Sequence, residues 1–161
     1  MNSWEPNHTR RFSAFLARSL LVVQREHAKI YRQLALSISK LSVLCEVDGE
    51  QVRLVSDGLR LHLSESRYST DVSQDVILRT SRKVIRQLLR GELTLERAVW
   101  NDAVFLKGEL EHVLSFYDGL QLYFAAAVRS PAFPLLLREF MSEPSTRGAS
   151  LNGHQQERAL R

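Results

Sequence analysis

The sequence predicts a single α+β domain in which helices accompany five short strands. Three observations support this fold class. Apolar residues recur every three or four positions from residue 9 to 39, a spacing typical of an amphipathic helix. From 41 to 63 they recur every second position, and Asp-Gly pairs at 48–49 and 57–58 predict tight turns between strands. After residue 81 the helical spacing returns, on both sides of one further short strand.

The first predicted helix runs from about Thr9, its expected N-cap, to Ser39. Seven Lys or Arg residues lie between Thr9 and Lys40, against a single acidic residue, Glu26. They fall mostly opposite the apolar stripe, so this helix presents a basic face. Such a face is most often simply solvated, but it can also meet nucleic acid, an acidic partner or an anionic membrane surface. The apolar stripe comprises Phe12, Leu16, Leu20, Val23, His27, Ile30, Leu34 and Ile38.

Strands are predicted next, as an antiparallel meander of three over residues 41–63 and a fourth over 74–80. Cys45 shares a strand face with three apolar residues, which predicts a buried, inert thiol. His62 alternates with two leucines and is therefore expected on the solvent side of the sheet.

Two short helices follow, with Ser81 and Thr94 as their expected N-caps. Gly91 suits the left-handed position that ends the first of them. A last strand is expected over Ala103 to Lys107, and a short helix begins at Pro134.

The helix from about Glu109 to Arg129 carries more apolar surface than one core face needs. A helix that is apolar over most of its circumference is buried on two sides, docked to a partner subunit, or lines an apolar cavity. A homodimer with this helix at its interface is therefore one interpretation. Gly119, inside the pattern, permits a bend or a close approach. One stripe comprises Leu110, Val113, Leu114, Tyr117, Leu120, Phe124 and Val128, and Phe116, Leu122 and Tyr123 lie well around the cylinder from it.

Length and composition indicate one soluble globular domain, which we expect in the cytoplasm. The chain has 161 residues, of which 44% are hydrophobic and 25% charged, with a net charge of +4. A single cysteine fits a reducing compartment, and the polar start of the chain has no signal-peptide pattern. The apolar run from Gly119 to Val128 is about half the length that a membrane-spanning helix requires. We expect a polar lead over 1–8, one domain over 9–142 and a disordered tail over 143–161.

Several short motifs in the second half of the chain occur in a distinctive order. They are the strand Asp75-Val76-Ile77-Leu78, the turn Gly91-Glu92-Leu93, a helix ending with Ala98 and Trp100, and a strand from Val104 to Gly108. This order resembles the sterol carrier protein type two family, over roughly residues 10 to 141. The chain departs from the family pattern at Asp102, where glycine is usual, and at Ala103, where lysine is usual. We expect this departure to change the backbone turn at these two residues and the entrance to the pocket that the family has.

The resemblance implies a five-stranded, mostly antiparallel sheet with helices covering one face, and an apolar cavity between the sheet and the C-terminal helices. It also implies a lipid-like ligand, held by burial of apolar surface at about 25 cal/mol per Å². The apolar helix described above and the segment from Phe133 to Met141 support such a cavity independently. Taken one at a time, the lining residues named next are explained by ordinary core packing. Only the complete set has more apolar surface than a core of this size needs. We expect the lining to comprise Trp100, Phe105, Val113, Phe116, Tyr117, Leu120 and Phe124, with Leu136 and Phe140 as a lid.

The sequence shows no catalytic or metal-binding motif. It has no GxSxG, Walker, dinucleotide-binding or HExxH pattern, and its five histidines lack metal-ligand spacing, so we expect no cofactor and no metal. We expect no nucleic-acid binding either, because the basic helix lacks interleaved aromatic residues. A carboxylate facing an apolar cavity would have a raised pKa and could act as an acid or base.

Two functions from different classes follow. The leading hypothesis is a non-catalytic binding or carrier protein for a hydrophobic lipid-like or isoprenoid molecule, which it presents to partner enzymes. The resemblance implies this role, as in the sterol-carrier-like factors of bacterial quinone synthesis. The alternative is a small biosynthetic enzyme that uses the same cavity, with Asp102, Glu109 or His112 as its proton-transfer groups.

Overall fold

The computed structural model describes residues 11–65 and 73–142. The polar lead over 1–8, the Thr9 cap, most of the loop before the fourth strand and the tail over 143–161 lie outside the described residues. The elements in chain order are α1 (Phe12–Glu26), α2 (Ala28–Ser37), β1 (Ser42–Val47), β2 (Glu50–Ser56), β3 (Leu61–Glu65), β4 (Val76–Thr80), α3 (Arg82–Leu89), α4 (Leu95–Trp100), β5 (Phe105–Gly108), α5 (Leu110–Arg129) and α6 (Phe133–Met141).

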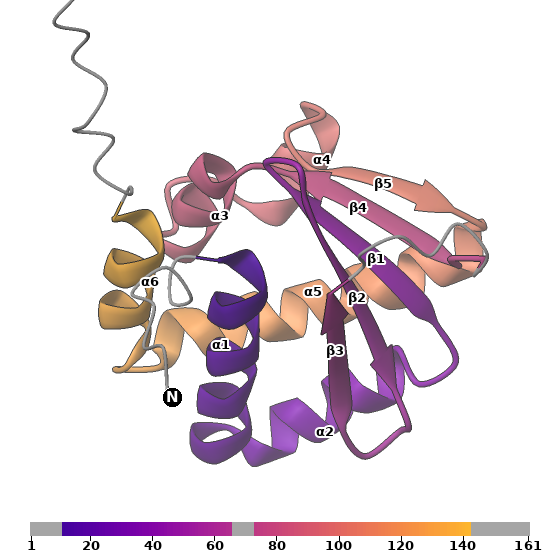
Figure 1. Ribbon diagram of the computed structural model, residues 1–161, viewed down its shortest axis with the longest axis horizontal. Helices are drawn as coiled ribbons and strands as arrows, with labels where there is room; N and C mark the ends of the chain where they lie inside the picture. The colour runs from indigo at the N-terminus through magenta and orange to yellow at the C-terminus, as the bar shows by residue number, and fades with distance from the viewer. Residues whose placement is uncertain (1–10, 66–72, 143–161) are drawn as a thin grey trace, which may run out of the picture.

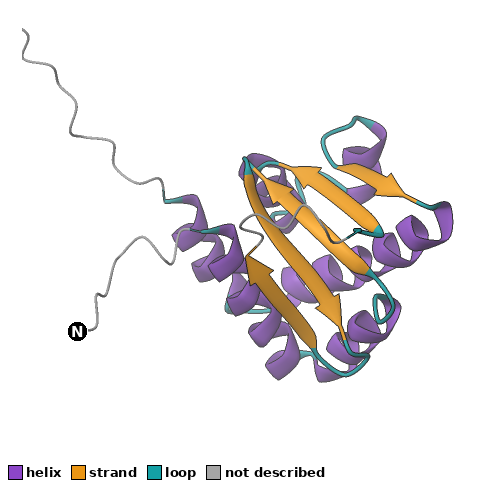
Figure 2. Ribbon diagram, turned by 45° about the vertical axis from the view of Figure 1, so that its right-hand side comes forward, coloured by secondary structure: helices purple, strands orange, loops and turns teal. Residues whose placement is uncertain are grey.

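The strands form one sheet in the order β3-β2-β1-β4-β5. Only β1 and β4 pair in parallel, which confirms the predicted five-stranded, mostly antiparallel sheet. Asp75, the first residue of the strand motif, helps to set that parallel register. Its carboxylate accepts a hydrogen bond from the Ser42 backbone N–H at 2.7 Å, while its own N–H donates to the Ser42 carbonyl at 2.9 Å. Figures 1 and 2 show the main helices behind one face of this sheet, so the core lies between the two layers.

The predicted continuous helix from Thr9 to Ser39 is wrong, because the chain bends at His27. That residue has φ −135° and ψ 55°, which ends α1 and begins α2. No proline or glycine causes the break. The two helices differ in their main neighbours, since α1 packs mostly against α6 and strands β2 and β3 whereas α2 packs mostly against α5 (Figure 1).

The close contact between α2 and α5 depends on Gly119. A Cβ atom added at this glycine would lie 2.9 Å from Ser37 Oγ and 3.1 Å from Leu34 Cδ1. The sequence-based expectation of a close approach at Gly119 is therefore confirmed. Because of this close approach, α5 lies across the helix-covered face of the sheet, where it also contacts β4 and β5.

Polar groups at the helix ends agree with the predicted caps. Ser81 Oγ accepts a hydrogen bond from the Val84 N–H at 3.2 Å, and Thr94 Oγ1 accepts one from the Arg97 N–H at 3.3 Å. Gly91 has φ +70°, the left-handed conformation expected after α3.

A residue distant in the sequence caps α1. The Glu50 carboxylate, from the start of β2, accepts hydrogen bonds from the backbone N–H groups of Phe12 and Ser13 at 2.8 and 3.1 Å. A carboxylate at a helix N-terminus is favoured by the helix dipole. This contact fixes the start of α1 to the sheet.

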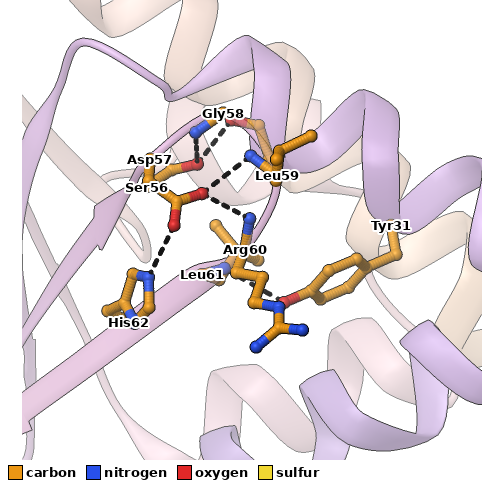
Figure 3. A network of polar contacts seen from close by, with 9 residues as sticks. Tyr31, Ser56, Asp57, Gly58, Leu59, Arg60, Leu61 and His62 are labelled. Carbon is orange, nitrogen blue, oxygen red and sulfur yellow. Dashed lines mark hydrogen bonds and ion pairs between the residues drawn. The ribbon is translucent and has the colours of Figure 1, made fainter.

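The turn between β2 and β3 is held by Asp57. One carboxylate oxygen accepts from the backbone N–H groups of Leu59 and Arg60 at 2.8 and 2.7 Å, and the other lies 3.1 Å from His62 Nε2 (Figure 3). The exposed position of His62 confirms the sequence prediction. Tyr31 of α2 accepts a hydrogen bond from the Leu61 N–H at 3.0 Å, which ties this edge strand to the helical layer.

Candidate ligand-binding cavity

An apolar cavity of about 80 Å³ lies between the sheet and the helices. It is placed where the resemblance implied, but α1 contributes to its wall as well as the later helices. The residues that line it are Phe12, Phe15, Leu16 and Leu20 of α1; Leu34 of α2; Cys45, Val47, Leu54, Leu61, Leu78 and Thr80 of the strands; Ile85 and Leu88 of α3; Leu95 and Val104; and Phe116, Gly119, Leu120, Tyr123 and Phe124 of α5.

The two hydroxyl groups in the wall already have hydrogen-bond partners. Thr80 Oγ1 donates to the Ala103 carbonyl at 2.9 Å. The Tyr123 hydroxyl donates to Ser19 Oγ at 2.8 Å, and Ser19 Oγ donates in turn to the Leu16 carbonyl at 2.8 Å. Cavities of this apolar kind stay dry, because water needs polar partners that the wall does not supply. The space therefore suits hydrocarbon and disfavours a polar head group.

Burial makes the titratable groups of the wall poor acids. Desolvation raises the pKa of the Cys45 thiol to about 12, so the group stays protonated near neutral pH and is chemically inert. Desolvation also raises the pKa of the Tyr123 hydroxyl, and its hydrogen bond with Ser19 offsets only part of that effect. Neither side chain is suited to nucleophilic or general-base catalysis at neutral pH.

The cavity is small for one that binds a lipid-like ligand. A dry engineered cavity of about 150 Å³ binds benzene, and pockets for drug-sized ligands measure about 300–1,000 Å³. At about 80 Å³ the present space accommodates only a short hydrocarbon segment. A lipid-like ligand requires the walls to move apart.

Three of the residues predicted to line a cavity do so: Phe116, Leu120 and Phe124. They lie on the face of α5 that is directed at α1 and the sheet. Val113 and Tyr117 are half-buried on the same helix but lie outside the lining set.

Trp100 and Phe105 lie away from the cavity, contrary to the sequence-based expectation. Trp100 is 87% exposed, because Leu95 and Ala98 occupy the buried positions of the short helix α4. Phe105 is 40% exposed on the edge strand β5, where the Arg79 guanidinium lies 5.8 Å from its ring centroid. The aromatic end of α4 is therefore a surface feature.

The two residues predicted as a lid form a second layer instead. Leu136 and Phe140 are buried, and neither lines the cavity. Phe140 stacks on Phe15, which does line it. The Arg82 guanidinium lies 4.8 Å from the Phe140 ring centroid and 3.8 Å from the Glu50 carboxylate, so α6 is held against α1 and α3.

The predicted core stripe of α5 requires correction. Leu110, Leu114 and Val128 are 72%, 53% and 58% exposed, whereas Phe116 and Tyr123 are buried. The buried face follows Gly119, because only this position allows α2 to approach. The surplus apolar surface inferred from the sequence thus lies on the solvent side, mainly at the two ends of the helix.

Sequence reasoning missed the contribution of α1 to the wall. Phe12, Leu16 and Leu20 belong to the apolar stripe of the first predicted helix, so the signal was present. The stripe shows that a face is buried but does not show which space it borders.

None of the proposed proton-transfer residues lines the cavity. Asp102 and Glu109 are exposed and His112 is half-buried on the outer part of the fold. Asp102 has φ +57°, a left-handed conformation that glycine also adopts, so the departure from the family pattern is compatible with the same kind of turn. Within residues 11–65 and 73–142, no group of three His, Cys, Asp or Glu side chains could hold a metal ion.

Comparisons with known proteins identify the fold. No protein-family model and no curated protein matches the sequence. Among solved structures, a UbiJ-SCP2 ubiquinone synthesis protein is 16% identical, with a TM-score of 0.50 over 69% of this chain and 94% of that one. The sterol carrier protein domain 2 of Helicoverpa armigera is 13% identical, with a TM-score of 0.51 over 80% of this chain and 97% of that one. The chain therefore has the sterol carrier protein fold, as the sequence motifs predicted.

No single described helix is both long and apolar enough to cross a membrane. The helices α5 and α6 reach the required length and composition only as a pair, and that pair is bent by 104°.

Proposed function

We propose that this protein binds a hydrophobic, lipid-like small molecule between its sheet and its helices and presents that molecule to partner enzymes without catalysing a reaction. The observation that carries the proposal is the cavity wall, in which every hydroxyl is already hydrogen-bonded and the rest is apolar. The fold supports the same conclusion, because the sterol carrier protein domain 2 of Helicoverpa armigera shares it.

Burial of hydrocarbon is the source of free energy for such binding. Each buried methylene contributes about 0.8 kcal/mol, so a segment of ten methylenes in a widened cavity would contribute about 8 kcal/mol before the costs of association and of moving the walls apart. Specific polar recognition inside the cavity is not required. Inside the cavity, the fit of the hydrocarbon to the apolar wall holds the ligand, without hydrogen bonds.

An isoprenoid ligand is the narrower form of the proposal. One solved structure of the same fold is titled a ubiquinone synthesis protein, and ubiquinone carries an isoprenoid tail. Partner enzymes acting on such a molecule are part of the same proposal.

Cytoplasmic location, membrane contact through the first helix and dimerisation through exposed α5 residues stay predictions. Two of the basic side chains on the first helix, Arg11 and Arg18, form ion pairs with Glu65 and Glu139.

The enzymatic alternative has less support, because Asp102, Glu109 and His112 do not reach the cavity. The variant Asp102→Asn tests the enzymatic alternative. If this variant no longer turns over a candidate pathway intermediate but is as stable as the wild type, the alternative is supported again.

Native mass spectrometry of protein purified without detergent, followed by solvent extraction, tests the binding function. We expect a co-purifying hydrophobic molecule and saturable uptake of a fluorescent fatty-acid analogue. The variant Leu120→Trp should abolish uptake, because its larger ring fills the cavity. Leu114→Trp is the matched control on the same helix, where the side chain is 53% exposed, and it should bind normally. Equal uptake by both variants, or none by the wild type, contradicts the proposal.

A further inference from the structure

A second hollow, of about 610 Å³, lies where α3, α5 and α6 meet. In Figure 1 the helices α3 and α6 lie side by side at one end of the molecule, next to the C-terminal part of α5. Three arginines line this hollow: Arg86 and Arg90 from α3 and its C-cap, and Arg138 from α6. We call it the arginine groove.

Within residues 11–65 and 73–142, little acidic charge neutralises the arginine groove. No acidic side chain is among the described residues that line it. Arg90 lies 3.9 Å from Glu92, but both side chains are at least half exposed, and such pairs contribute little. In the described part of the chain, Arg86 and Arg138 have no carboxylate within ion-pair distance.

Arg86 also has an unsatisfied donor. Its Nε atom is buried and has no hydrogen-bond partner among the described residues. Buried donors are nearly always paired in native structures, so this guanidinium keeps unused hydrogen-bonding capacity beside the groove. A carboxylate or phosphate oxygen is the acceptor that a guanidinium binds best.

The rest of the groove is apolar. Leu89, Phe133, Leu137 and Met141 are the larger apolar side chains that line it. A free inorganic anion would leave this surface unused. The combination of guanidinium groups with an apolar surface matches a molecule that has an acidic head and a hydrocarbon chain.

The groove and the cavity share a wall. Phe133 lines the groove and Tyr123 lines the cavity, and their rings are in edge-to-face contact with centroids 6.1 Å apart. Along α3, Ile85 and Leu88 face the cavity while Arg86 faces the groove. The contact between these two rings is therefore one place where the two spaces adjoin.

We infer that the arginine groove binds the acidic head group of an amphiphile whose hydrocarbon chain enters the cavity at the contact between Phe133 and Tyr123, which requires these two rings to move apart. The inference rests on the proposed function. The cavity wall offers no free polar group, so an acidic head must remain outside it. The groove adjoins the cavity, and the described residues that line it include three arginines and no acidic side chain.

Binding of a pyrene-labelled fatty acid and of its methyl ester tests this inference. The double variant Arg86→Gln/Arg138→Gln should bind the acid about tenfold more weakly, equivalent to about 1.4 kcal/mol, and should bind the ester as the wild type does. Added salt should weaken acid binding to the wild type more than to the double variant. Arg32→Gln, an exposed arginine of α2 outside the groove, is the matched control and should change neither affinity.

The outcomes separate the two proposals. If the double variant binds the acid as tightly as the wild type, the head-group site is overturned while the cavity proposal stands. If the wild type binds the acid through the arginines but never binds the ester, the head-group site stands and the cavity proposal fails. If the arginines matter only for binding to vesicles of anionic phospholipid, the groove meets a membrane surface and the inference is overturned.

Discussion

The ring of Phe140 stacks on the ring of Phe15, with centroids 4.3 Å apart and an interplanar angle of 16°. Phe15 lines the cavity, and Phe140 lies behind it as part of the last described helix. The C-terminal helix thus supports the cavity wall from outside. Any widening of the cavity toward α1 must disturb this pair.

We expect Phe140→Ala to destabilise the protein by about 3–5 kcal/mol, because the ring is 1% exposed and its removal leaves a cavity behind Phe15. Urea unfolding measures the change. Leu135→Ala, on the same helix but 58% exposed, is the control and should shift the free energy of unfolding by about 0.5 kcal/mol at most. Similar losses in both variants would show that α6 does not support the wall.

The buried pair of Ser19 and Tyr123 can be tested by a double-mutant cycle. Ser19→Ala leaves the Tyr123 hydroxyl buried without its acceptor, which should cost about 1–3 kcal/mol of unfolding free energy. Adding Tyr123→Phe removes the stranded hydroxyl, so the double variant should be more stable than Ser19→Ala alone. If the two substitutions have strictly additive effects in thermal or urea unfolding, the hydrogen bond contributes nothing.

Gly119→Ala should destabilise the fold although alanine favours helices by about 1 kcal/mol over glycine. The added Cβ would lie 2.9 Å from Ser37 Oγ and 3.1 Å from Leu34 Cδ1, so α2 must shift. We expect a net loss of about 1–2 kcal/mol in urea unfolding. Combining it with Ser37→Ala removes the nearest atom and should recover part of the loss. A more stable Gly119→Ala variant would show that the two helices are not in close contact.

Stability should depend on Asp57 at low pH. The hydrogen bond with His62, followed by those from the Arg60 and Leu59 backbone N–H groups, lowers the pKa of Asp57 to about 2. A carboxyl whose pKa is lower in the folded state stabilises the fold above its ordinary pKa of about 4 and loses that effect as the pH falls toward 2. The stability difference between the wild type and Asp57→Ala should therefore shrink over that interval. A difference that is constant from pH 7 to pH 2 contradicts the proposed turn network.

The local features of the fold could be predicted from the sequence because they depend on neighbouring residues. The caps Ser81 and Thr94, the left-handed Gly91 and the alternating burial of β4 are all produced by short-range chemistry. The motif around Asp75 was recognisable in the sequence but its structural role was not, because its carboxylate accepts a hydrogen bond from Ser42, 33 residues earlier in the chain.

The site was less predictable because it depends on which faces meet in space. Of the predicted lining residues, Phe116, Leu120 and Phe124 border the cavity, whereas Trp100 and Phe105, which belong to the motifs that carry the resemblance, lie at the surface. No sequence pattern distinguishes an aromatic residue that borders a cavity from one at an exposed helix end.

The class of fold, the number of strands and the apolar character of the helices can be predicted from the residues alone, because periodicity and turn chemistry are local properties. The break between α1 and α2 at His27, the inward Gly119 face of α5 and the three arginines beside Phe133 become visible only in the folded chain. These features arise from packing between segments far apart in the chain. Their energies depend on contacts that no single segment contains.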